Sequence, residues 1–280
     1  MKRFLMAVFA ASLLFSCGGN KQTGTADTAA DSVDTVAPDT SEVDSLELLV
    51  TDTPMPKAAD ELFDDFIFNF AANRNLQMER IRFPLPVTRN GKTDSLDQKR
   101  WKTERFFLHQ DYYTVLFDSE RQMALMNDTS VHKATVEKIY FNTGAVIQYE
   151  FHRIRGAWML TSVQTIPIAQ NRNASFLDFY HQFVTDSVYQ SESLHETVQF
   201  TGPDPDDDFA QMEGVITADT WPAFAPELPE KMIYNIVYGE PTKPTGETIF
   251  MMRGIANGFE MMMTFKQQQN GRWVLTKMNT

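Results

Sequence analysis

The chain has 280 residues, and its 37 acidic against 25 basic side chains give a formal net charge of −12 at neutral pH. A nucleic-acid-binding protein needs a basic surface to displace counterions from phosphates, so this balance argues against a nucleic-acid partner. Cys17 is the single cysteine, which excludes an internal disulfide and leaves packing as the source of stability.

Residues 1–16 have the pattern of a signal peptide. Lys2 and Arg3 precede an apolar run over residues 4–15, which is shorter than the ~20 residues of a membrane-spanning helix. The sequence Leu-Phe-Ser-Cys, followed by two glycines, resembles the lipoprotein box of bacteria. That resemblance implies a lipoprotein of the cell envelope, in which Cys17 becomes the mature N-terminus and carries acyl chains such as palmitate.

The place of Gly18 after the cysteine favours the outer membrane by analogy with enterobacterial lipoproteins, where Asp favours retention in the inner membrane. The leaflet stays open between a periplasmic and a surface-exposed position. An ordinary signal peptide with an incidental cysteine is the alternative.

Residues 17–57 are rich in Thr, Ala, Ser, Pro and acidic side chains. Such a segment cannot bury enough apolar surface to offset the entropy of ordering it. We therefore expect a disordered acidic tether, with a surface-export signal as the other interpretation.

Two similar segments open the globular part, residues 61–70 and 175–183. Phenylalanines and other apolar side chains recur in both at the i, i+3, i+4 spacing of an amphipathic helix, and Asp60 and Ser175 are suitable N-caps. We predict a helix in each segment, and a further helix ending near His195.

Strands are predicted at matching positions after each helix. Each half has a tryptophan in its middle (Trp101 and Trp221), then a strand-like run, and finally a hairpin whose second strand begins Gly-x-Trp-x-Leu-Thr. The strand-like runs and hairpin strands are residues 112–117, 144–151 and 156–161 in the first half and residues 233–238, 258–265 and 271–276 in the second. This internal repeat predicts two α+β domains, residues 58–168 and 172–280.

The order of a helix, a variable middle and a closing hairpin resembles the nuclear-transport-factor-2-like fold. The resemblance implies two tandem cone-like domains, each an N-terminal helix packed on a curved antiparallel sheet. With its lipobox and acidic spacer, the whole chain also resembles a Bacteroidetes lipoprotein family, the domain-of-unknown-function 4348 family. That family adds a location but no activity.

Some proteins of the cone fold are isomerases or dehydratases whose sites bury a carboxylate or histidine beside a tyrosine. The catalytic candidates here are His109, Tyr113, Glu150 and His152, with Asp111 and Tyr112 beside them in sequence. The alternative places Glu150 and His152 on the solvated face of a sheet.

The sequence predicts no metal site and no cofactor. No two histidines have metal-ligand spacing, and the acidic stretch 204–208 lacks the spacing of a calcium loop. Methionines at 251, 252 and 261–263 suit either an adaptable binding surface or core packing, with Phe259 expected on the core face. Residues 221–229 form an apolar loop that would be a lid or a wall.

The leading expectation is a protein that binds a small ligand or another envelope protein without catalysis. One alternative is an enzyme with a small pocket in the first domain that acts on an apolar or glycan-like substrate. The other is a structural subunit of an outer-membrane complex.

Overall fold

The computed structural model describes residues 57–280 except residues 108–111, 205 and 256–257. All of these belong to one compact unit, residues 41–280. The predicted signal peptide, Cys17 and the tether up to residue 56 lie outside the described residues. Within the described part, no helix has the length and apolar character needed to cross a membrane.

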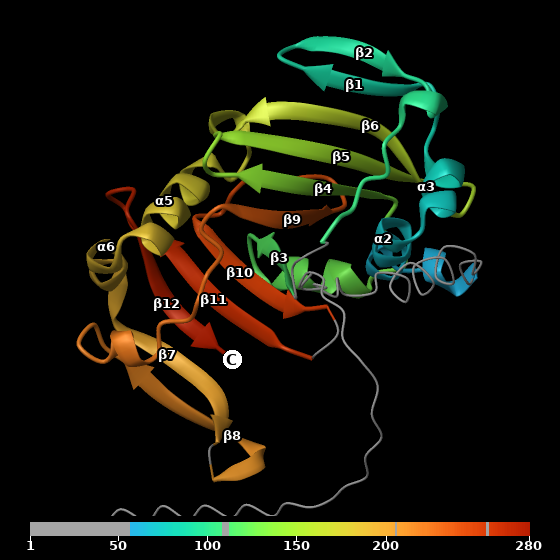
Figure 1. Ribbon diagram of the computed structural model, residues 1–280. Coiled ribbons are helices and arrows are strands. Elements are labelled where there is room, and N and C mark those ends of the chain that lie inside the picture. Colours follow the sequence, from blue (N-terminus) through green and yellow to red (C-terminus); the bar gives the residue numbers. More distant parts are fainter. Residues whose placement is uncertain (1–56, 108–111, 205, 256–257) are drawn as a thin grey trace, which may run out of the picture. The chain divides into compact units, whose positions relative to one another are not determined.

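The structure is a mixed α+β fold with two six-stranded sheets and few helices (Figure 1). The α-helices are α2 (Phe63–Ala72), α3 (Arg74–Arg80), α4 (Glu120–Met123), α5 (Ala174–Thr185) and α6 (Ser187–Glu192). The short 3-10 helices are η1 (Lys57–Asp60), η2 (Gln98–Arg100), η3 (Ala124–Asn127), η4 (Ile168–Gln170) and η5 (Trp221–Ala223).

Sheet 1 has the strand order β2-β1-β6-β5-β4-β9, and sheet 2 has the order β3-β10-β11-β12-β7-β8. The first six strands are β1 (Leu85–Arg89), β2 (Lys92–Leu96), β3 (Tyr112–Phe117), β4 (Lys133–Tyr140), β5 (Ala145–Ile154) and β6 (Ala157–Pro167). The other six are β7 (Leu194–Asp204), β8 (Asp207–Ile216), β9 (Met232–Tyr238), β10 (Glu247–Gly254), β11 (Glu260–Gln267) and β12 (Trp273–Asn279).

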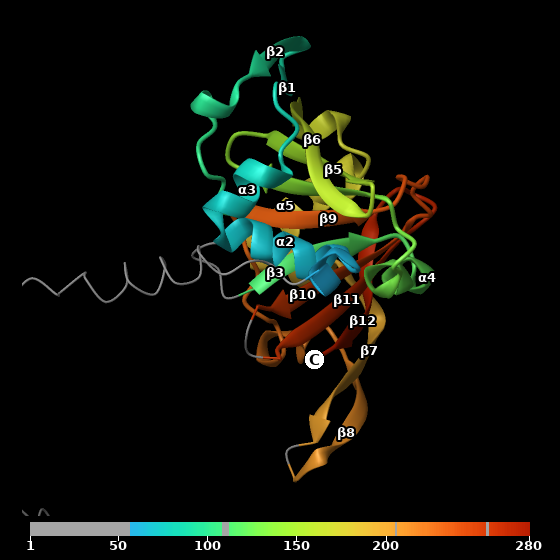
Figure 2. The same cartoon turned by 90° about the vertical axis from the view of Figure 1, so that its right-hand side faces the viewer.

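Strands β3 and β9 each join the sheet formed by the other half of the chain. β3 pairs antiparallel with β10, and β9 pairs antiparallel with β4 (Figure 1). The remaining strands of each sheet come from one continuous half of the described chain (Figure 2). The two halves are therefore tied together by main-chain hydrogen bonds as well as by side-chain packing.

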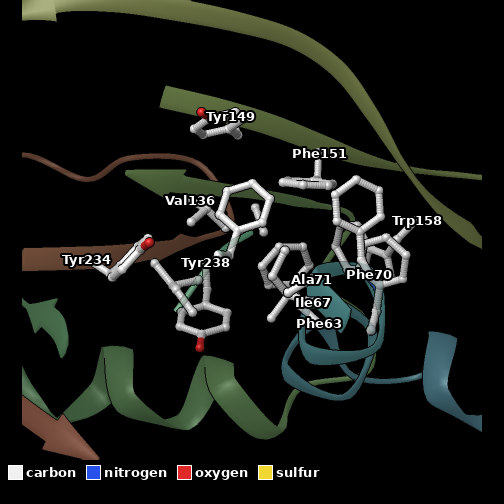
Figure 3. Close-up of a cluster of buried hydrophobic side chains, with 14 of the residues drawn as sticks. Phe63, Ile67, Phe70, Ala71, Val136, Tyr149, Phe151, Trp158, Tyr234 and Tyr238 are labelled. Atoms are coloured by element: carbon white, nitrogen blue, oxygen red, sulfur yellow. The ribbon is translucent and has the colours of Figure 1, made fainter. Parts of the chain in front are cut away.

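Core 1 forms where the apolar face of α2 packs against sheet 1 (Figure 3). Phe66, Phe70 and Phe151 are fully buried, and the rings of Phe70 and Phe151 meet edge to face with centroids 5.3 Å apart. Trp158, on the closing hairpin, stacks on Phe66 at 6.5 Å. The i, i+3, i+4 spacing of the helix thus delivers its rings to one sheet face.

Core 2 repeats this geometry around α5. Phe183 meets Phe265 edge to face at 5.4 Å, and Phe179 stacks on Trp273 at 6.4 Å. Trp273 is the first residue of β12, and Trp158 lies near the start of β6. The closing hairpins of the two halves therefore place a tryptophan at the same position against α5 and α2.

The second helices match as well. The indole nitrogen of Trp101 donates to Gln77 of α3 at 3.1 Å, and that of Trp221 donates to Gln190 of α6 at 2.9 Å. Trp221 is buried and Trp101 is partly buried, and in both places a glutamine on the short second helix accepts the indole N–H.

Three local predictions are wrong. The helix starts differ because α2 has Leu62 as its N-cap and α5 has Asn173, and Asp60 instead forms an ion pair with Arg80 at 2.8 Å. His195 lies in β7, since α6 already ends at Glu192. Phe259 precedes β11 and is exposed, because the alternation that buries Met261 and Met263 does not extend back to it.

The methionines serve packing in both cores. Met252, Met261 and Met263 lie in core 2, while Met251 and Met262 contact core 1 from the opposite face of sheet 2. Both faces of β10 and β11 are therefore covered over this stretch. The apolar loop packs against core 2 at its two ends, because Trp221 is buried there and the Tyr180 hydroxyl donates to the carbonyl of Pro229 at 3.1 Å, while residues 222–225 are exposed.

Candidate functional site

An internal ion pair lies among aromatic residues of core 1. The Lys138 ammonium contacts Glu104 and lies 5.4 Å from the ring centroid of Phe106. Tyr149 donates to the same Glu104 carboxylate at 2.6 Å. The Lys138 ammonium group is thus paired with a carboxylate and surrounded by aromatic rings of the same chain. Candidate ligand sites lie instead on the outer faces of the sheets.

A groove of about 620 Å³ lies on the outer face of sheet 2, by which we mean the face opposite core 2, and we call it the sheet-2 groove. Ile249 in its wall also belongs to core 1, which covers the neighbouring part of the same face. Strands β7, β10, β11 and β12 supply most of its wall, because alternate side chains of adjacent strands share a face. The lining residues are Glu120, His195, Thr197, Gln199, Glu247, Ile249, Thr264, Lys266, Gln268, Val274, Thr276 and Lys277.

Hydroxyl, amide and charged side chains line the sheet-2 groove together with Ile249 and Val274. Its two lysines are matched by two glutamates, and one pair, Lys266 with Glu247, is in contact at 3.3 Å. The groove is therefore close to neutral, in a chain whose net charge is strongly negative. Thr276 donates to the main-chain carbonyl of Thr264 at 3.0 Å, which fixes that hydroxyl in the wall.

A second groove, of about 330 Å³, lies on the corresponding face of sheet 1, and we call it the sheet-1 groove. It is lined by Thr135, Glu137, Gln148, Gln164, Ile166, Gln170, Arg172, Val237 and Pro241. Residues of both halves meet here because β9 lies beside β4.

Glu137 is the centre of a buried polar network beneath this groove. Only 1% of its surface is exposed, and its carboxylate accepts from the side-chain amides of Gln148 (2.8 Å), Asn171 (2.8 Å) and Asn235 (2.7 Å). Asn235, on β9, in turn accepts from the main-chain N–H of Leu116 on β3 at 2.8 Å. The network thereby connects both exchanged strands, and a buried charge of this kind is tolerable because every neighbour donates to it.

Arg172 closes one end of the sheet-1 groove. Its guanidinium contacts the buried carboxylate of Asp118 and donates to the carbonyl of Thr242 at 2.8 Å. The Thr242 hydroxyl also donates to Asp118 at 2.8 Å. The arginine charge is therefore compensated inside the protein.

Glu150 and His152 lie on the outer face of sheet 1 with side chains 35% and 40% exposed. Glu150 contacts Lys133 at 3.1 Å, His152 at 3.0 Å and Ser162 at 3.0 Å. Burial acts to raise the pKa of Glu150, but the hydrogen bonds from Lys133, Ser162 and His152 outweigh it and lower the pKa. None of these partners is a tyrosine, which agrees with the solvated-face alternative.

Tyr113 is placed differently, in core 1 beside a carboxylate that the sequence did not single out. Its hydroxyl donates to Asp64 of α2 at 3.4 Å, and the Tyr238 hydroxyl also donates to Asp64. Burial raises the pKa of Asp64, and burial together with the charge of Asp64 raises the pKa of Tyr113. Among the predicted candidates that the structure describes, only Tyr113 therefore meets the pairing of tyrosine and buried carboxylate.

The other predicted residues contribute less. His109 and Asp111 lie outside the described residues, as does Cys17. Tyr112 packs against core 2. In the described ranges, no group of three histidine, cysteine or acidic side chains is arranged to hold a metal ion.

Sequence reasoning missed Asp64, Glu137 and Arg172, because a single charged residue in an ordinary helix or strand carries no signal of burial. The sheet-2 groove had a partial signal. Thr264 and Lys266 alternate with buried methionines along β11, which marks a polar face without showing that the face is hollow.

The comparisons with known proteins agree with this fold. The crystal structure of an NTF2-like protein from Bacteroides fragilis NCTC 9343 is 40% identical to the chain, with a TM-score of 0.72. The match covers 81% of this chain and 98% of that one. No curated protein matches. A family described as a domain of unknown function (DUF4348) matches residues 42–280, and the chain belongs to this family.

Proposed function

We propose that this protein is a lipid-anchored, non-catalytic binding protein of the cell envelope, and that its sheet-2 groove holds an uncharged, polyhydroxylated, glycan-like ligand. The observation that carries the proposal is the groove itself. It is large enough for a small organic ligand, since ligand pockets measure about 300–1,000 Å³.

The lining chemistry supports this ligand class. Threonine hydroxyls and glutamine amides both donate and accept hydrogen bonds, as the hydroxyls of a sugar require. The Lys266–Glu247 pair can meet a hydroxyl with a donor and an acceptor at once. The balance of two lysines and two glutamates gives no net attraction for a strongly charged ligand.

The anchored location is proposed from the sequence of residues 1–19. Acyl chains on Cys17 would retain the protein on the outer membrane, with residues 18–57 as a spacer. Intact-mass measurement of the native protein tests this: the proposal expects the mass of the chain from Cys17 plus acyl groups. A Cys17→Ser variant should leave the membrane fraction. An unmodified native N-terminus would contradict the anchor.

We also propose that the described part comprises two duplicated cone domains that have exchanged their third strands. The support is the repeated element order, the matched ring stacking of Trp158 and Trp273, and the matched indole–glutamine bonds. In this arrangement the predicted ranges 58–168 and 172–280 remain the units of duplication, while β3 and β9 complete each other's sheets.

The binding proposal is tested with the intact, detergent-solubilised chain and a panel of neutral tetrasaccharides, measured by saturation-transfer NMR. At least one sugar should bind, and Thr264→Val, which removes one groove hydroxyl, should weaken that sugar about fivefold. Thr165→Val, on β6 outside both grooves, is the matched control and should bind normally. No binding by any sugar, or equal loss in both variants, would contradict the proposal.

A second candidate function is an enzyme of the first domain. The observation in its favour is Asp64, a buried carboxylate with a raised pKa that accepts from Tyr113 and Tyr238. Glu150 and His152 do not join this cluster.

If the protein is instead a structural subunit of an envelope complex, a stoichiometric partner will co-purify with the native lipidated protein and the sugars will fail to bind.

A further inference from the structure

We propose that the sheet-1 groove is a second binding site, for a small molecule that carries a primary ammonium group. The proposal concerns a different face from the sheet-2 groove and does not depend on a glycan binding there. It stands on the orientation of the amides in the wall and on the local excess of carboxylates.

Glu137 fixes the orientation of the Gln148 side-chain amide. A carboxylate only accepts hydrogen bonds, so the contact of 2.8 Å with Glu137 must be made by the Gln148 NH₂ group. The carbonyl oxygen of the same amide is therefore turned away from Glu137. Because Gln148 lines the groove, this oxygen is an acceptor fixed at the wall.

The buried side-chain amides of Asn171 and Asn235 are each fixed in one orientation. Asn171 donates to Glu137 and accepts from the main-chain N–H of Asn173 at 2.8 Å. Asn235 donates to Glu137 and accepts from Leu116. Reversing either amide would break two bonds, so the carboxylate holds the network in one pattern.

The cations near the sheet-1 groove are already paired with carboxylates. Lys133 lies 3.1 Å from both Glu150 and Glu240, and Arg172 contacts Asp118, so each nearby cation already has a carboxylate partner. Thr135, in the groove wall, is the register partner of Glu150. The lining itself carries one carboxylate, Glu137, and one cation, Arg172. The ion pairs of Arg172 and of Lys133 add Asp118, Glu150 and Glu240, so these linked groups comprise four carboxylates and two cations.

The ammonium group of a bound ligand would therefore find hydrogen-bond acceptors in the groove wall and a negative electrostatic potential from the nearby carboxylates. It would be held by the Gln148 carbonyl oxygen and the Thr135 hydroxyl, with the Glu137 charge behind them. Glu137 itself is too deeply covered for full contact, so its part is to position the amides and to supply charge. The volume of about 330 Å³ equals that of ~10 water molecules, which suits a small amine rather than a polymer.

The test is calorimetric titration of the intact chain with 1,4-diaminobutane at low salt, with 1,4-butanediol as the neutral probe of equal length. The diamine should bind and the diol should not. Gln164→Lys places a cation in the exposed wall of the groove and should weaken the diamine at least about tenfold. Gln211→Lys makes the same change on β8, outside both grooves, and should leave the affinity within about twofold.

A second variant tests the wall amide without adding a charge. Gln148→Met keeps the side-chain volume but removes the carbonyl oxygen, together with the NH₂ group that donates to Glu137, and it should also weaken the diamine. Thermal unfolding of each variant shows whether it is folded. The proposal is overturned if the diamine does not bind, if the diol binds equally well, or if a folded Gln164→Lys variant binds the diamine normally.

Discussion

The Glu137 network leads to a prediction in which one substitution destabilises the fold and a second restores the stability. In Glu137→Gln, the remaining oxygen can still accept from Gln148 and Asn171, but the new NH₂ group faces the NH₂ group of Asn235. Asn235 cannot reverse without losing its bond from Leu116. Two buried donors are then left facing each other.

The magnitude follows from burial. Asn235 is fully buried, and an unsatisfied buried donor costs about 1–3 kcal/mol. Loss of a charge-assisted bond adds to this, so Glu137→Gln should lower the free energy of unfolding by about 2–4 kcal/mol. Asn235→Asp alone should be at least as costly, because it places two carboxylates at a contact that now measures 2.7 Å.

The double variant Glu137→Gln with Asn235→Asp restores the pattern. The amide introduced at position 137 would donate to one oxygen of the carboxylate introduced at position 235, and the other oxygen would accept from Leu116. Urea unfolding of the native protein, both single variants and the double variant at pH 7 gives the coupling between the two sites. We expect the double variant to regain at least about 2 kcal/mol over the sum of the single losses. If the losses simply add, the network does not hold the exchanged strands as described.

Three further predictions concern stability. Burial raises the pKa of Asp64 above its usual value, so protonation of Asp64 stabilises the folded state. The free energy of unfolding of the native protein, relative to that of Asp64→Asn, should therefore rise as the pH falls from about 7 to about 4. A difference between the two proteins that stays constant with pH in urea unfolding would refute this. Phe66→Ala and Phe179→Ala should each cost about 3–5 kcal/mol in the same assay, and clearly unequal costs would argue against equivalent cores. A Cβ at Gly202 would lie 2.6 Å from a phenylalanine ring carbon, so Gly202→Ala should lower stability by about 1–2 kcal/mol, whereas Gly214→Ala, in open space, should change it by less than ~0.5 kcal/mol.

The local patterns predicted the helices and closing hairpins well, because each depends on periodicity within a few residues. α2 and α5 coincide with most of the predicted segments, although α2 begins at Phe63, and the predicted strand at 112–117 is β3. The exchange of β3 and β9 was not predicted, since periodicity describes the faces of a strand and not its neighbour. The near-continuous apolar run of residues 112–117 was a sign that both faces of this strand are covered, and the structure buries Tyr113 to Phe117.

The candidate site was predicted less completely. The sequence marked Glu150 and His152 as possible catalytic groups or as solvated strand residues, and their exposure favours the second. Asp64 and Glu137 were missed because their burial arises from contacts between distant segments. Tyr238, for example, reaches Asp64 across most of the described chain.

The most direct test of the binding account is to map backbone amide chemical shifts of the ¹⁵N-labelled intact chain while adding the neutral tetrasaccharide that binds. The account predicts that the largest shifts occur on the outer face of sheet 2, at Gln199, Thr264 and Lys277. Shifts centred instead on the Asp64–Tyr113 cluster, or no shifts with any sugar of the panel, would contradict it.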